Sequence, residues 1–101
     1  MSWLVILSYE LYNASKTDFA KINGGLKSLG LINEIISEYG TTNELPMHTF
    51  AGQFTKDADN TSEEIVNYIK DSVKKLFDDS KVEGKMFVAA GENWSWGELV
   101  T

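Results

Sequence analysis

The sequence contains no cysteine and no arginine, and it has a single proline and a single histidine in 101 residues. Without cysteine, the chain can form no disulfide, thiolate zinc site, iron–sulfur cluster or cysteine nucleophile. Without arginine, it lacks the planar cation that binds phosphates and guanine edges through paired hydrogen bonds. Its nine basic residues are all lysines, fifteen acidic residues outnumber them, and the formal net charge is −6. This composition argues against a polyanionic partner held by net charge.

Long apolar segments are also missing. The N-terminal apolar run from Trp3 to Leu7 has no basic flank and no small-residue cleavage site, so it is typical of a strand and not of a signal peptide. No stretch approaches the roughly 20 residues needed to cross a bilayer. We expect a soluble, cytoplasmic, single-domain protein without a membrane partner.

Hydrophobic periodicity predicts the order strand, helix, strand, strand, helix, strand. The predicted strands cover residues 3–9, 31–38, 47–55 and 85–90, and the predicted helices cover residues 15–30 and 61–80. Segment 31–38 suits a helix nearly as well, but Gly30 before it and the turn-rich residues 39–46 after it favour a strand. A polar loop is predicted at residues 56–60. This order is the βαββαβ pattern of an α+β, ferredoxin-like domain, with two helices on one face of a four-stranded antiparallel sheet.

The predicted sheet leaves one face without helices. Because the first and third strands are apolar on both sides, we expect this face to be covered, most simply by a second copy of the chain in a homodimer. Residues 1–91 form the predicted domain. Residues 92–101 form a tail that we expect to add a strand at the sheet edge, in the same or the partner subunit. Trp94 and Trp96 in this tail are predicted interface residues, and packing onto their own subunit is the alternative.

Three residues are candidates for chemistry near the first strand. Glu10 follows this strand directly, where a carboxylate could bind a divalent metal or simply face water. The Tyr9 hydroxyl could orient a neighbouring group or donate a hydrogen bond to it, and the alternative is that Tyr9 is simply a packed aromatic ring. His48 is the sole imidazole available as a general acid or base, although a lone histidine is more often structural. Lys74 and Lys75 on the second helix could hold RNA phosphates, but they alternate with acidic residues as on an ordinary solvated helix face.

The segments Leu4–Leu11, Leu26–Gly30 and Lys85–Val88 resemble the small ferredoxin-like nucleases of CRISPR adaptation and their stand-alone relatives, the VapD toxins and GhoS-type antitoxins. The stretch from Ser37 to Phe50, followed by Ser62–Ile65, is most similar to the GhoS type, which cuts the messenger RNA of a toxin. In the CRISPR-type nucleases an aspartate at the end of the first strand holds the metal beside its symmetry mate. The resemblance therefore implies a metal-assisted endoribonuclease or antitoxin, with Mg²⁺ at Glu10.

Two functions remain open from the sequence. The first is this RNA-cutting antitoxin, with Glu10 as the metal ligand at a dimer seam. The second is a non-catalytic, acidic, dimeric module that binds or inhibits a protein partner through the same sheet and tail. Arginine and an aspartate at the end of the first strand would favour the nuclease. The sequence contains no arginine, and Glu10 stands in the place of that aspartate.

Overall fold

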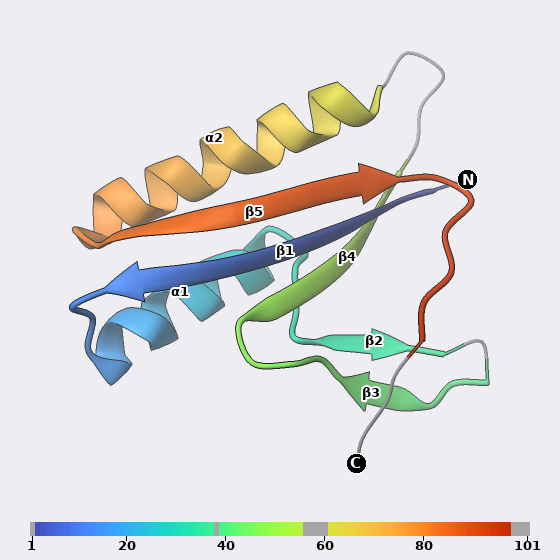
Figure 1. Cartoon of the computed structure of the whole chain (residues 1–101), viewed down its shortest axis with the longest axis horizontal. Coiled ribbons are helices and arrows are strands. Elements are labelled where there is room, and N and C mark those ends of the chain that lie inside the picture. Colours follow the sequence, from blue (N-terminus) through green and yellow to red (C-terminus); the bar gives the residue numbers. More distant parts are fainter. Residues whose placement is uncertain (1, 38, 56–60, 98–101) are drawn as a thin grey trace.

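The computed structural model describes residues 2–37, 39–55 and 61–97, and it has an α+β architecture (Figure 1). Its elements in chain order are β1 (Ser2–Tyr12), α1 (Lys16–Ser28), β2 (Glu34–Ile36), β3 (Thr42–Glu44), β4 (Thr49–Thr55), α2 (Ser62–Ser80) and β5 (Glu83–Gly91). Both predicted helices are confirmed. The loop predicted at residues 56–60 lies outside the described residues.

The main sheet has three antiparallel strands in the order β4-β1-β5. The central position expected for the first strand is confirmed: Ile6 of β1 lies between Ala51 of β4 and Ala89 of β5. Side chains alternate between the two faces of the sheet. The odd-numbered residues of β1 face the helices, and the even-numbered residues face the helix-free side.

The expected four-stranded sheet is wrong, because most of segment 31–38 pairs elsewhere. Only Ile32 forms a bridge with Ala51 of β4. The side-chain amide of Asn33 then donates to two backbone carbonyls ahead of and within β4, those of Pro46 and Thr49. Beyond this point β2 pairs with β3, which forms inside the predicted loop, so a separate two-stranded hairpin results.

Capping interactions define where the two helices begin and where α2 ends. Ser15 and Asp18 form a reciprocal capping box at the start of α1. Thr61 accepts a hydrogen bond from the Glu64 backbone N–H at the start of α2, and Lys81 ends this helix in a left-handed conformation with φ 56°. In the part of the chain that the structure describes, no helix is long and apolar enough to span a membrane.

The main core lies between the helices and the sheet. Val5 and Leu7 of β1 are fully buried there against Ile22 of α1 and Ile69 of α2. The apolar face predicted for α2 is confirmed, since its buried residues recur at helical spacing: Ile65, Ile69, Val73 and Phe77.

A second, smaller cluster covers part of the helix-free face. Leu4, Ile35 and Ala51 are buried there, and Trp94 and Trp96 pack against them. The tail runs from the end of β5 down towards the hairpin (Figure 1) and has no strand in residues 92–97, so the expected added strand is absent from this part of it. Residues 98–101 lie outside the described part. The chain's own hairpin and tail thus supply cover that the sequence suggested a second copy would provide.

Candidate functional site

Glu10 forms an ion pair with Lys85, its neighbour across the β1–β5 ladder. Register places the two residues opposite each other, and Lys85 Nζ lies 3.1 Å from Glu10 Oε1. The hydrogen bond to Glu10, followed by the attraction between the opposite charges, raises the pKa of Lys85 above its usual value. Both side chains remain more than half exposed to solvent. A metal ion at Glu10 would therefore have to compete with a lysine ammonium already bound there.

Two aromatic side chains flank this ion pair on the helix-free face. Phe87 lies opposite Ser8 and is 67% exposed, and Tyr12 at the end of β1 is 50% exposed. We call these five residues, Ser8, Glu10, Tyr12, Lys85 and Phe87, the exposed sheet end. A shallow cavity of about 510 Å³ here is lined in part by Ser8, Glu10, Lys85 and Phe87. Its size lies within the range of ligand sites.

Tyr9 and His48 lie together, but on the other side of the sheet from Glu10. The Tyr9 ring stacks on the His48 ring at a centroid distance of 5.3 Å, and His48 stacks on Phe19 of α1 at 4.8 Å. The Tyr9 hydroxyl donates to the side-chain oxygen of Asn23, and burial raises the pKa of Tyr9 to about 12. The pleat of β1 directs the Tyr9 ring to the helix side of the sheet and the Glu10 side chain to the other side, although both residues contribute to the lining of the cavity at the exposed sheet end.

The two candidate RNA-binding lysines have different surroundings on α2. Lys74 Nζ lies 2.8 Å from Asp78 Oδ2 one turn along the helix, and this hydrogen bond raises the pKa of Lys74. Lys74 also lines a groove between α2 and β5, together with Lys85. Lys75 is exposed and is not among the residues lining that groove. The geometry thus connects Lys74, through Lys85, to the neighbourhood of Glu10.

Trp94 and Trp96 make their described contacts within their own chain. Both are half-buried against the second core cluster, as the alternative interpretation of the tail held. They also line a cavity of about 750 Å³ with residues of the hairpin, including Ile36 and Tyr39. A role for these tryptophans in contacts with another subunit stays a prediction.

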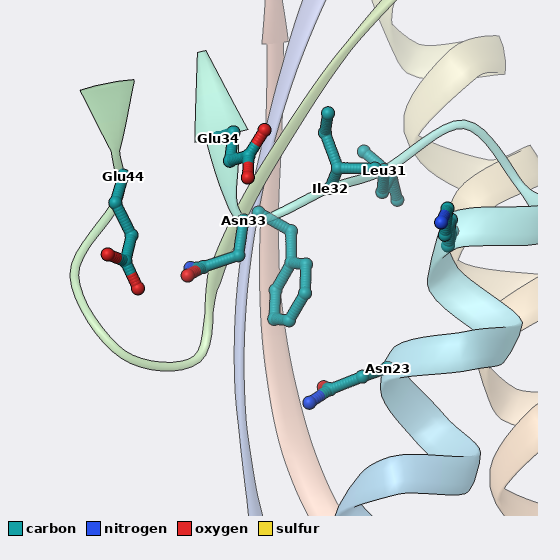
Figure 2. Close-up of a pocket in the computed structure, with 8 residues that line it drawn as sticks. Asn23, Leu31, Ile32, Asn33, Glu34 and Glu44 are labelled. Atoms are coloured by element: carbon teal, nitrogen blue, oxygen red, sulfur yellow. The ribbon is translucent and has the colours of Figure 1, made fainter. Parts of the chain in front are cut away.

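A further cavity, of about 350 Å³, lies between α1 and the hairpin, and the sequence did not predict it. Figure 2 shows Glu34 and Glu44 on neighbouring strands at one side of it and Asn23 of α1 at the other. The β2–β3 register places the two glutamates opposite each other, and Lys27 lines the same cavity. Nothing in the sequence signals this pairing, because Glu44 lies in a segment that reads as a loop.

Lys85 and Phe87 lie in a predicted strand, and the sequence alone predicts no functional role for them. The sequence does show opposite charges near the ends of two strands, but they predict an ion pair only when the register between the strands is known. Among the residues that the structure describes, no three histidine, aspartate or glutamate side chains form a group that could hold a metal ion. No family model matches the chain, and no curated protein matches its sequence.

Proposed function

We propose that this chain is a cytoplasmic, ferredoxin-like binding module of the antitoxin type, which acts by contact with a protein and not by cutting RNA. The ferredoxin-like assignment is supported by the strand order β4-β1-β5 and by the bridge between Ile32 and Ala51. This bridge puts the segment after α1 beside β4, on the side away from β1. The resulting spatial order of chain segments is the one expected of a βαββαβ domain.

The observation that carries the binding function is the composition of the exposed sheet end. The carboxylate that a nuclease would need, Glu10, is paired with Lys85, and exposed aromatic rings flank the pair. Aromatic side chains around a neutralised ion pair are typical of a protein-binding surface, where they bury a large area at small entropic cost. In a chain with net charge −6, a locally neutral surface also avoids repulsion between two copies.

A homodimer formed through this surface is part of the proposal. The hairpin and tail cover the Leu4–Ala51 region of the helix-free face, which leaves the exposed sheet end for a partner. Light scattering on the wild type should give a dimer mass, and Phe87→Lys should shift it to that of one chain. Tyr68→Lys is the matched control, because Tyr68 is 54% exposed on α2, away from this face. A wild type of single-chain mass at all concentrations would contradict the dimer.

A metal-assisted endoribonuclease is the second candidate. The position of Glu10 near the end of β1 favours it, together with Lys74 and Lys85 in the adjoining groove. In this mechanism Glu10 would hold Mg²⁺ through its carboxylate oxygens, and the ion would stabilise the charge that develops on the phosphate during cleavage. The two lysines would hold the neighbouring phosphates as point charges.

One assay distinguishes the two functions. Purified chain is incubated with structured and unstructured RNA in Mg²⁺, Mn²⁺ or EDTA, and Glu10→Ala and Glu34→Ala are run beside the wild type. Glu34 is the matched control because it is an exposed strand glutamate on the hairpin. The binding module predicts no cleavage above the background of the EDTA samples. Cleavage that requires metal, is lost in Glu10→Ala and is retained in Glu34→Ala would establish the nuclease instead.

A further inference from the structure

The outer edge of β5 has no strand beside it in the described part of the chain. β5 pairs with β1 on one side and is the last strand of the main sheet on the other. It is nine residues long and contains no proline. Its two charged residues, Glu83 and Lys85, lie in its first three positions, and Met86–Gly91 carries no charge that would discourage pairing. A row of backbone donors and acceptors is therefore available to another extended chain.

A groove runs beside this edge, between β5 and α2. Its volume is about 460 Å³, and apolar side chains from both elements line it: Val73, Phe77, Val82 and Met86. Charged side chains also line it, three of each sign: Lys70, Lys74, Lys85, Asp71, Asp78 and Glu83. The groove thus combines an apolar surface with balanced charge, in a protein that is otherwise strongly acidic.

We propose that the β5 edge and the α2–β5 groove bind an extended, uncharged apolar peptide segment of a partner protein, which adds to the sheet as a further strand. This inference rests on the proposed protein-binding function and names a partner class for it. Main-chain hydrogen bonds to β5 supply affinity in this mode of recognition, and pockets for alternate side chains supply specificity. Every second side chain of the segment enters the groove beside Met86, on the helix side of the sheet.

A lone segment fits this place better than the β5 strand of a second copy. In Figure 1 α2 runs along β5 on the side away from β1. Two β5 strands paired about a two-fold axis would lie about 4.8 Å apart, and each would bring its own α2 into the same layer. Packed helices need about 8–10 Å between their axes. A peptide without a helix avoids this conflict, and the balanced charge of the groove matches a segment with little net charge.

The test uses a capped hexapeptide of alternating valine and threonine, titrated into the full-length chain and followed by amide chemical shifts. We expect the largest shifts at residues 84–90 and on the groove-facing side of α2, with slowed hydrogen exchange of β5 amides. The same peptide with every backbone nitrogen methylated keeps its side chains but loses its main-chain donors on both edges. It should bind at least about tenfold more weakly.

Two variants of β5 form a matched pair for this titration. Met86→Glu puts a charge into the apolar groove and should weaken binding about tenfold or more. Ala89→Glu puts the same charge on an exposed residue of the same strand that faces the other side of the sheet, outside the exposed sheet end, and should retain most of the affinity. Thermal melting of both variants verifies that they are folded, and the methylated peptide tests the proposal independently of any substitution.

Several results would overturn the inference. The inference is wrong if millimolar peptide causes no chemical-shift changes, or if the changes centre on Tyr39 and Trp96 instead of β5. It is also wrong if the methylated peptide binds as tightly as the unmethylated one. Protection of the outward-pointing β5 amides that rises with protein concentration, without peptide and also in Phe87→Lys, would assign the edge to a second copy. None of these outcomes requires metal-dependent RNA cleavage, so the failure of this inference is separable from the failure of the proposed function.

Discussion

Two adjacent glycines of α1 provide a matched test of how the two helices pack. A Cβ atom on Gly24 would meet no heavy atom within 4 Å, whereas one on Gly25 would lie 2.5 Å from Cδ1 of Leu76 on α2. Replacing glycine by alanine inside a helix removes a penalty of about 0.5–1 kcal/mol, which is mainly backbone entropy. We therefore expect Gly24→Ala to raise the free energy of unfolding by that amount.

Gly25→Ala gains the same helix propensity but must push Leu76 aside. The nearest obstructing atoms are the methyl groups of a flexible leucine side chain, so the cost should lie at the lower end of the range for overpacking, and Gly25→Ala should be less stable than Gly24→Ala by about 1 kcal/mol. Urea denaturation measures the difference, and it corresponds to at least about 4 °C in melting temperature for a domain of this size. In a Leu76→Ala background the difference should disappear, because the obstructing methyl groups are gone. Equal stability of the two alanine variants in the wild-type background would refute the close helix contact.

Three other substitutions test the sheet, a helix cap and a buried ring. Gly52→Ala on β4 should lower the free energy of unfolding by about 3 kcal/mol or more, because its Cβ would collide with the backbone oxygen of Gly30. Gly97→Ala is the control in the same urea titration: its new Cβ would meet no atom within 4 Å, so the free energy of unfolding should not change. Thr61→Ala should cost about 1 kcal/mol through loss of the α2 cap, and Thr61→Ser should restore it. Burial raises the pKa of Tyr9 from 10.0 to about 12, so its contribution to stability is complete below pH 10 and is lost as the pH rises towards 12. Tyr9→Phe should flatten that part of the stability profile, and an unchanged alkaline decline would contradict this role.

The long elements could be predicted because each carries a repeated local signal. α2 shows apolar residues at helical spacing behind a capping threonine, and β1 is an apolar run too short for a membrane helix. The hairpin could not be predicted in the same way. Its strands, Glu34–Ile36 and Thr42–Glu44, have three residues each, and the second lies among turn-forming residues. Pairings this short depend on tertiary contacts such as those of Asn33, which local propensity does not report.

The candidate site illustrates the same limit. The position of Glu10 near the end of a strand could be predicted, but its ion pair with Lys85 depends on the register of β5 against β1. Adjacency in the sequence predicts that Tyr9 lies beside Glu10. The pleat of the strand separates them, and the Tyr9 ring instead joins His48 and Phe19 on the helix side.

The unequal cover of the helix-free face explains why the exposed sheet end is the best candidate for a contact with another molecule. Trp94 and Trp96 pack on the Leu4–Ala51 region, so this half of the face satisfies its apolar area within one chain. Phe87 is not a member of this cluster, and it remains two-thirds exposed. Burying an aromatic ring of this kind is worth a few kcal/mol at about 25 cal/mol per Å². Two such rings brought together across a dimer would gain this energy from each copy, and the Glu10–Lys85 pair beside Phe87 would keep this part of the surface electrically neutral.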